Sequence, residues 1–467
     1  MKKRHLFCLL GLLACTVGMA FASGKKEGDS PEPTGLIRRT SGPVEYWQDV
    51  DALSSASLLK ASPSRFGYVD EEQGRYYMKI VDVNNPGALA LSAPVPDGHN
   101  VAMWTVNNEG KIAVVTADQY GRSEFKGRSV VIFNANLQKE AEFPFGNPTG
   151  AYAQPLSHRE PGLAFTDKYV VIGWNDNDGT VKGEMYITVY ALADGKSGSI
   201  QVTNNLGIGN LSALAVHDDY IIVGGSTATR VCKISTGSAL NIEPAAGTTT
   251  ADGAGGCHWI KSNESYALES VQGKGTVRVW KWQGDNTPTL ESTVSFDGDS
   301  SGSVQAMSFG VDDPDSAYIF GKVAGGSVGK AYKIDLASLS GGGTTTLTTP
   351  IFTKTTFGTE STGQMWIIER AEKNGDVYYA LAGGVGANEN GPSGFLFLKN
   401  PIAEDGDYAD NSPVITYNSF NWFWTLVRSA RLLKNDSGDI FFVAKNHAAR
   451  EAYEITPYRL RVQKIND

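Results

Sequence analysis

Short runs that alternate between apolar and polar residues recur along most of the chain. In residues 276–282, Val277 and Val279 share one face, whereas Arg278 is expected to lie away from the core. A period of two residues is that of a β-strand and not of a helix. Turns such as residues 436–438 separate the runs and are rich in Gly, Asn and Asp, which accept the positive φ of tight hairpins. The pattern predicts an all-β protein.

The strand-like runs recur as eight pairs, each joined by a turn and spaced at intervals typical of propeller blades. A further apolar stretch precedes each pair, and several pairs are followed by another, which gives four strands per unit. The predicted innermost strands include residues 101–106, 211–216, 258–260, 364–368 and 424–433.

These repeats predict a closed β-propeller of eight four-stranded blades, or of seven blades if a terminal unit is incomplete. The last unit lacks an outer strand, because the chain ends at Asp467. Residues 44–49 are predicted to supply that strand and to close the ring, since unpaired sheet edges invite aggregation.

The first residues indicate export. Three basic residues at positions 2–4 precede an uncharged stretch over residues 6–22, which is the pattern of a secretory signal peptide. Small residues before Ser23 fit cleavage there. Residues 12–15 instead resemble a lipobox, in which Cys15 would carry a lipid and anchor the protein to the outer membrane. The apolar residues beyond Cys15 favour cleavage at Ser23, and both alternatives stay open.

Removal of the signal peptide makes an acidic chain more acidic. Residues 1–22 carry three positive charges and no negative ones, so the formal net charge changes from −9 to −9 − 3 = −12. An acidic chain without a basic run repels nucleic acid, which we exclude as a partner. Residues 23–43 contain few apolar side chains and are predicted to be a flexible tether, which leaves 44–467 for the propeller.

Two cysteines lie beyond the signal peptide, Cys232 and Cys257. In an exported protein they are able to form one disulfide. Alternatively, they are two buried thiols that pack as small apolar residues. Their spacing is not that of a zinc site.

Two segments carry family resemblances. Residues 275–280 (GTVRVW) resemble the third strand of a WD-type repeat, and residues 76–86 (YYMKIVDVNNP) are similar to the repeat of bacterial exported propellers. Both resemblances imply the propeller architecture and neither implies an activity. The leader, with its lipobox-like signal and a dibasic Arg38-Arg39 before Thr40, resembles fimbrial subunits of the Bacteroidetes, which implies an accessory subunit of a surface fimbrium.

One polar loop resembles the first half of an EF-hand calcium loop. Its oxygen-bearing residues are Asp297, Asp299 and Ser301, followed by Gly302. The twelfth position of the pattern, where a bidentate Glu is required, is Ser308. Calcium binding and a simple solvated turn therefore stay open as alternatives.

Aromatic residues gather at the starts of the predicted innermost strands, which meet at one mouth of a propeller's central channel. An aromatic wall with a few polar groups suits a small ligand or a glycan. In the alternative interpretation these tryptophans pack between blades. The candidate residues are Trp104, Trp259, Trp366, Trp424, His99 and His258, with Gln305 beside them.

Export, the tether and the repeat fold favour a non-enzymatic binding or adhesion protein of the cell envelope or a secreted one. The expected partner is a glycan, a small ligand or an envelope protein. One alternative is the accessory subunit of a fimbrium. Another is a carbohydrate-active or quinone-dependent propeller enzyme, although nothing in the sequence selects the two facing carboxylates that a glycosidase needs.

Overall fold

Alternating buried residues define the strands of the chain. The computed structural model describes residues 45–50, 57–58, 64–72, 75–84, 89–96, 100–117, 127–144, 153–155, 162–176, 184–246, 255–296, 302–322, 329–339, 341–354, 356–357, 360–361, 364–384, 393–400, 415–419, 431–447 and 458–465. They belong to one structural unit, Ile37–Asp467.

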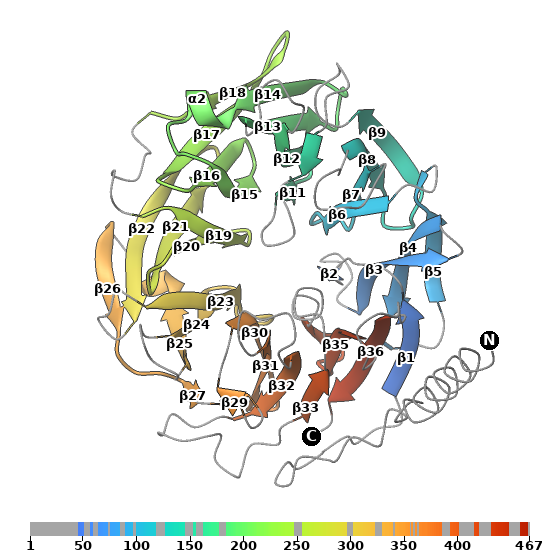
Figure 1. Ribbon diagram of the computed structural model, residues 1–467, viewed down its shortest axis with the longest axis vertical. Helices are drawn as coiled ribbons and strands as arrows, with labels where there is room; N and C mark the ends of the chain where they lie inside the picture. Colours follow the sequence, from blue (N-terminus) through green and yellow to red (C-terminus); the bar gives the residue numbers. More distant parts are fainter. Residues whose placement is uncertain are drawn as a thin grey trace, which may run out of the picture. The chain divides into compact units, whose positions relative to one another are not determined.

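The described strands form eight sheets of four or five strands, which we number in chain order (Figure 1). Sheet 1 contains β2 (Ser57–Leu58), β3 (Arg65–Glu72), β4 (Arg75–Asp82) and β5 (Leu89–Pro94); sheet 2 contains β6 (Asn100–Val106), β7 (Ile112–Ala117), β8 (Gly127–Phe133) and β9 (Lys139–Pro144). Sheet 3 contains β10 (Ala153–Pro155), β11 (Leu163–Phe165), β12 (Tyr169–Asp176), β13 (Glu184–Ala191) and β14 (Ser197–Gln201); sheet 4 contains β15 (Leu211–His217), β16 (Tyr220–Gly225), β17 (Thr229–Thr236) and β18 (Leu240–Pro244).

The later sheets are also antiparallel, except for one parallel pair of strands in sheet 5. Sheet 5 contains β19 (Cys257–Ser262), β20 (Tyr266–Val271), β21 (Thr276–Gln283), β22 (Asn286–Phe296) and β26 (Gly343–Leu347); sheet 6 contains β23 (Ser303–Phe309), β24 (Ser316–Lys322), β25 (Gly329–Asp335) and β27 (Phe352–Lys354). Sheet 7 contains β30 (Gln364–Lys373), β31 (Asp376–Gly384), β32 (Ser393–Lys399) and β33 (Ile415–Ser419); sheet 8 contains β34 (Arg431–Lys434), β35 (Ile440–His447), β36 (Tyr458–Ile465) and β1 (Glu45–Val50).

Three smaller elements complete the described chain. A hairpin pairs β28 (Thr356–Phe357) with β29 (Glu360–Ser361), and the short helices are α2 (Val202–Asn205) and η2 (Leu336–Ser338). Helices in the described parts of the chain are all too short to cross a membrane. The sequence-based prediction of an all-β protein built from four-stranded antiparallel sheets is confirmed.

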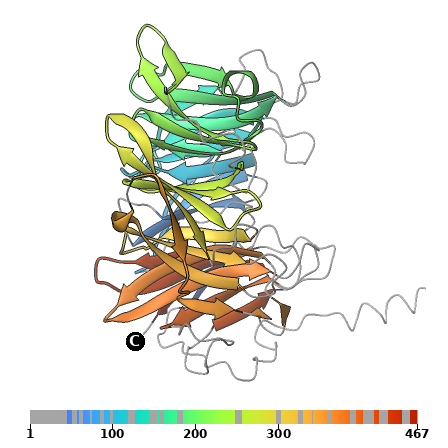
Figure 2. The same ribbon diagram turned by 90° about the vertical axis from the view of Figure 1, so that its left-hand side faces the viewer.

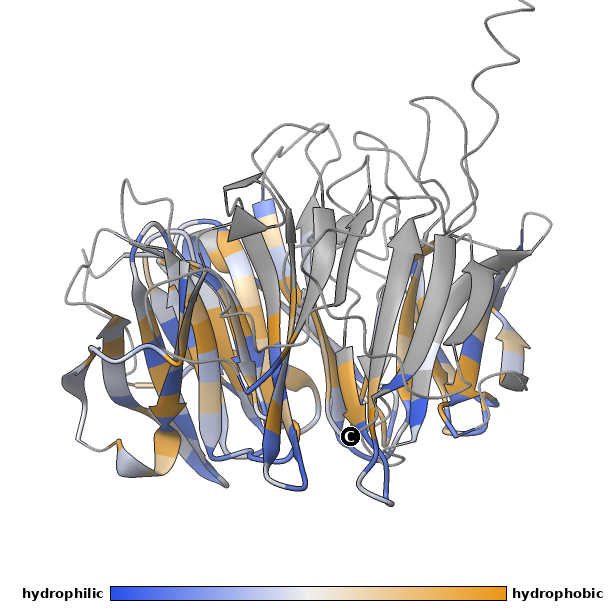
Figure 3. Ribbon diagram, turned by 90° about the horizontal axis from the view of Figure 1, so that it is seen from below, coloured by the Kyte–Doolittle hydropathy of each residue, from blue (hydrophilic) through white to orange (hydrophobic). Residues whose placement is uncertain are grey.

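Inner strands such as β16 and β20 are buried on both faces, because successive sheets lie side by side (Figures 1 and 2). Strand β7 shows how the period of two is used. Ile112 and Val114 pack into the apolar layer with sheet 1, whereas Ala113 and Val115 pack into the layer with sheet 3. Each fully buried Val, Ile or Leu contributes about 1.5–3 kcal/mol. Figure 3 shows the resulting pattern, with apolar residues in the strands and hydrophilic ones in the hairpin turns at one end.

Contacts between neighbouring sheets follow the chain order and return to its start. Strand β15 contacts β19, β23 contacts β30, and β30 contacts β34. Sheet 8 in turn contacts sheet 1, through β1 with β3 and through β34 with β2. Strands β6, β11, β15, β19 and β23 of sheets 2 to 6 lie nearest the centre in Figure 1.

The N-terminal strand β1 pairs antiparallel with β36, in a register that runs from Glu45 opposite Gln463 to Val50 opposite Tyr458. The sequence placed this strand at residues 44–49, and the structure shifts it by one residue. A feature that the sequence did not predict is β26, which comes from the connection between β25 and β27 of sheet 6. It pairs in parallel with β22 of sheet 5, so the two sheets are also linked at their outer strands.

We predict that deletion of Glu45–Val50 lowers the free energy of unfolding by several kcal/mol, at about 1 kcal/mol net for each lost backbone hydrogen bond. The exposed edge of β36 should also cause concentration-dependent association. Urea unfolding and light scattering measure the two effects. Deletion of residues 24–40 serves as the control and should change neither quantity; an unchanged unfolding midpoint after loss of β1 would contradict the prediction.

Candidate functional site

Five of the first strands contain one extra residue near their start. In β19, Cys257 pairs with Val271 and Trp259 pairs with Ser270, so His258 has no opposite residue. Such a β-bulge interrupts strand pairing and re-aims the extra side chain, and bulges are common beside functional sites. The extra residues, which we call the bulge set, are Ala102 in β6, Ser212 in β15, His258 in β19, Gln305 in β23 and Trp366 in β30.

The described side chains of the bulge set are more exposed than their neighbours. Ser212, His258 and Gln305 are partly exposed, whereas the residues on either side of each are buried. A first strand is covered on both faces by adjacent sheets and on one edge by the second strand. Solvent therefore reaches these side chains from the inner edge or from the start of the strand.

Glycines opposite two of the bulges explain how the neighbouring sheet comes so close. A Cβ atom on Gly224, across from the Ser212 bulge, would lie 2.4 Å from Cys257 Sγ. A Cβ atom on Gly321, across from the Gln305 bulge, would lie 2.3 Å from the Phe296 ring. Only glycine leaves room for these side chains from sheet 5, so the packing around the bulges is tight.

A buried ion pair lies at the same end of the strands, between sheets 4 and 5. Arg278 Nη1 donates to Glu269 Oε1, and Arg278 Nη2 donates to the Gly255 carbonyl at 2.8 Å. Glu269 also accepts hydrogen bonds from Thr229 Oγ1 and, at 2.8 Å, from Trp280 Nε1. The side chains of Glu269 and Arg278 are 0% and 3% exposed. The expectation that Arg278 lies away from the core is therefore wrong, because a carboxylate on the adjacent strand neutralises its charge.

This ion pair fixes the chain that leads into β19. Gly255 and Gly256 come just before the strand, and a Cβ atom on Gly256 would lie 2.1 Å from the Ser226 carbonyl oxygen. The Gln272 N–H donates to the Gly256 carbonyl at 2.7 Å. The backbone two residues before His258 is thus held by sheets 4 and 5 together.

The predicted aromatic wall is only partly realised. Trp104 is buried between sheets 1 and 2, and Trp259 between sheets 5 and 6. The bulges are the physical reason, since one extra residue reverses which side chains face the neighbouring sheet. Trp104 and Trp259 therefore pack between sheets, and the prediction that they line the mouth of the central channel is wrong.

Two other predicted residues, His258 and Trp366, are themselves in the bulge set. His258 lies against Trp259, with ring centroids 4.3 Å apart. His99 and Trp424 lie outside the described residues, and so do Asp297, Asp299, Ser301 and Cys15. Sequence reasoning missed Ser212 and Ala102; the signal that marks them is a small residue that breaks the apolar alternation at the start of a strand.

The two cysteines occupy different apolar layers. Cys232 packs between sheets 3 and 4, and Cys257 packs between sheets 4 and 5. Both are buried thiols and not a disulfide, because sheet 4 separates them. Burial raises the pKa of the Cys232 thiol to about 12, which makes it a poor nucleophile.

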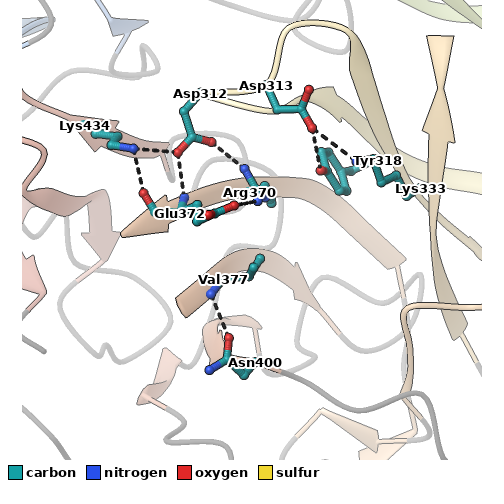
Figure 4. A network of polar contacts seen from close by, with 9 residues as sticks. All are labelled: Asp312, Asp313, Tyr318, Lys333, Arg370, Glu372, Val377, Asn400 and Lys434. Atoms are coloured by element: carbon teal, nitrogen blue, oxygen red, sulfur yellow. Dashed lines mark hydrogen bonds and ion pairs between the residues drawn. The ribbon is translucent and has the colours of Figure 1, made fainter. Parts of the chain in front are cut away.

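Charged side chains at the opposite end of the strands bind one another (Figure 4). Asp312, in the turn after β23, accepts hydrogen bonds from Arg370 at 2.6 Å and from Lys434 at 2.8 Å. The Glu372 backbone N–H donates to Asp312 at 2.8 Å, and the Glu372 carboxylate pairs with Arg370. These residues come from sheets 6, 7 and 8, so the network joins three sheets.

Hydrogen bonding decides the charge state of this network. Burial acts to raise the pKa of Asp312, but the Lys434 and Glu372 donors and the Arg370 charge outweigh it and hold that pKa below its usual value. Lys464 and Lys373 likewise lower the pKa of Asp439 despite its partial burial. The network is therefore ionised and internally neutralised at neutral pH, which suits a structural role.

Among the described residues, no group of three or more His, Cys, Asp or Glu side chains is placed to hold a metal ion. What the bulge set offers chemically is a hydroxyl, an imidazole and an amide at the starts of neighbouring strands. These groups donate and accept hydrogen bonds without carrying a fixed charge.

No protein-family profile matches the chain, and no curated protein matches it by sequence. Several solved structures resemble its fold. AztD from Citrobacter koseri has 13% identity over 78% of this chain and 89% of its own, with a TM-score of 0.41. An oligogalacturonate lyase in complex with manganese has 10% identity over 90% of both chains and a TM-score of 0.41.

The β-propeller domain of the Trilobed protease from Pyrococcus furiosus has 11% identity over 78% of this chain and 99% of its own, with a TM-score of 0.37. At these identities and TM-scores, none of the three structures identifies an activity, a ligand or a partner for this chain.

We predict that Glu269→Ala lowers the free energy of unfolding by about 3–5 kcal/mol, because it leaves the Arg278 charge buried and unpaired. Replacing both partners, Glu269→Leu with Arg278→Met, should cost much less. Urea unfolding measures both. The exposed pair of Lys139 with Glu142 is the control, and Glu142→Ala should cost less than about 1 kcal/mol. Equal losses for the single and the double variant would contradict this account.

A second prediction concerns the stability of the folded protein at low pH. Since the pKa values of Asp312 and Asp439 are lowered by folding, their contribution to stability is present above the unfolded pKa of about 4 and is lost as the pH falls through the lower folded value. Unfolding followed from pH 7 to pH 2 should show stability falling below about pH 4. Asp312→Asn should flatten that fall, whereas Asp315→Asn, at an exposed turn position, should leave its slope unchanged.

Proposed function

We propose that the chain is an exported, non-enzymatic binding protein of the cell envelope that takes its ligand at the bulge set. In this proposal the eight sheets are the blades of a closed β-propeller, and β1 completes the last blade. The order of contacts supports closure, because each sheet contacts the next and sheet 8 contacts sheet 1. Cleavage at Ser23 would release the protein, and lipidation of Cys15 would instead tether it to the membrane through residues 23–43.

The observation that carries this proposal is the repetition of the bulge. Five first strands have an extra residue within their first three positions, although the five sequences differ. A bulge weakens strand pairing, so the same irregularity in five sheets is best explained by the side chains that it presents. The described ones are a hydroxyl, an imidazole and an amide, which are varied hydrogen-bonding groups for recognition.

Several connections at the end where the bulge set lies are longer than the turns between first and second strands. The first and second strands of sheets 2, 4, 5 and 7 are joined by tight turns over residues 107–111, 218–219, 263–265 and 374–375. Connections at the opposite end, where the bulge set lies, include residues 118–126, 177–183, 323–328 and 385–392. Binding residues occur preferentially on such longer connections, which a rigid scaffold positions.

Nearby carboxylates support binding without catalysis. Glu269 is held by three donors, and Glu369 Oε2 accepts a hydrogen bond from the Leu432 N–H at 2.6 Å. A carboxylate that neutralises a buried arginine is poorly suited to act as a general acid or base. Adhesion to a surface glycan or to an envelope protein, including the accessory role in a fimbrium, would use the same face.

We predict that a variant carrying Ser212→Ala, His258→Ala and Gln305→Ala loses at least about tenfold in affinity for native envelope preparations, since each lost hydrogen bond costs about 0.5–1.5 kcal/mol. Binding of the labelled full chain to isolated envelopes measures this.

The control variant carries Ser235→Ala and Gln283→Ala, which remove the same groups from strand ends away from the bulge set. Both variants must keep the wild-type unfolding midpoint. Undiminished envelope binding by the triple variant, or an equal loss in the control, would refute the proposed site.

A further inference from the structure

Five of the inner strands carry very little charge for an acidic chain. Charged residues make up 19% of the whole sequence. Strand β34 of sheet 8 carries Arg431 and Lys434, and Lys434 binds Asp312. In β6, β11, β15, β19 and β23, by contrast, Lys261 is the one residue of the Asp, Glu, Lys or Arg type. A charged ligand would require opposite charges at its binding site, and these strands do not supply them.

Charges on β30, the remaining bulged strand, are paired within the protein: three of its side chains bind other sheets, and the Glu372 carboxylate pairs with Arg370 of the same strand. Glu369 binds the backbone of Leu432, Arg370 binds Asp312, and Lys373 binds Asp439. All three come after Trp366 in the strand and lead toward the tight-turn end. The side chains at the bulges themselves are a methyl group, a hydroxyl, an imidazole, an amide and an indole.

The bulges also disfavour an extended peptide as the ligand. A peptide that adds to a sheet edge needs an unbroken ladder of N–H and C=O groups. Each of five first strands has a bulge in its pairing with the second strand at the end that faces this site, and a bulge bends the strand away from the regular geometry that an added peptide strand would need. Recognition by separate hydroxyl, amide and imidazole groups is typical of binding to sugars. The partly exposed His258 imidazole lies tilted against the buried Trp259 ring.

We propose that the bulge set binds a neutral carbohydrate. This inference rests on the proposed function and adds to it the chemical class of the ligand. Its hydroxyl groups would exchange hydrogen bonds with Ser212, His258 and Gln305, and binding would depend little on salt because no charges are paired.

The test follows the histidine imidazole signals of the full chain by NMR during titration with three probes. They are neutral hexose oligosaccharides, uronic acid oligosaccharides of equal length, and an uncharged extended peptide. The expected result is a saturable shift of the His258 signals with a neutral oligosaccharide alone. His217, stacked on Trp282 at the tight-turn end, should not move and serves as the internal reference.

The dissociation constant should be the same at low and high salt. It should rise roughly three- to tenfold in Gln305→Ala and stay unchanged in Gln283→Ala. A response to the uronic acid or peptide probe in place of the neutral one would overturn the ligand class and leave the binding face intact. If no probe causes a shift while envelope binding is still reduced in the triple variant, the assignment of a neutral carbohydrate is also overturned. The proposed function fails by a different result, namely envelope binding that the triple variant leaves unchanged.

Discussion

The burial of both faces of the inner strands is the constraint on which the rest of this structure depends. Strands β16 and β20 are buried at all six of their positions, whereas outer strands such as β9 and β18 are exposed at alternate or most positions. The inner strands therefore expose only their ends and their inner edges. This restricts where the ligand that we propose could reach them.

Side-chain hydrogen bonds link neighbouring sheets in addition to the apolar layers between them. After β6, β19 and β34 comes an asparagine whose Oδ1 accepts a hydrogen bond from its own turn and whose Nδ2 donates to the next sheet. Asn107 reaches Asp167 at 2.9 Å, Asn263 reaches the Pro314 carbonyl at 2.9 Å, and Asn435 reaches Asn84 at 2.8 Å. The last of these bonds joins sheet 8 to sheet 1. Together with the Asp312 network, these bonds link neighbouring sheets at the tight-turn end, opposite the bulged end at which we propose that the ligand binds.

The two ends of the strands use polar residues differently. At the tight-turn end, charges are paired across sheet boundaries and carry stability. At the other end, the one buried charge pair, among the residues that the structure describes, holds the backbone before His258, and the side chains at the bulges are uncharged. Rigid support beneath a varied set of hydrogen-bonding groups reduces the entropy that binding must overcome.

The sequence by itself determined the all-β class and the four-stranded repeat, because a period of two and glycine-rich turns are local signals. It also predicted the pairing of the N-terminal strand with the last sheet, because the last unit of the repeat lacked an outer strand. It also identified His258 and Trp366 as candidate residues. Only the tertiary structure decided that Trp104 and Trp259 are buried, that Arg278 pairs inside the core with Glu269, and that β26 joins a neighbouring sheet. Each of these depends on a bulge, a partner on another strand or a long-range pairing, and one extra residue in a strand is enough to reverse which side chain faces the core.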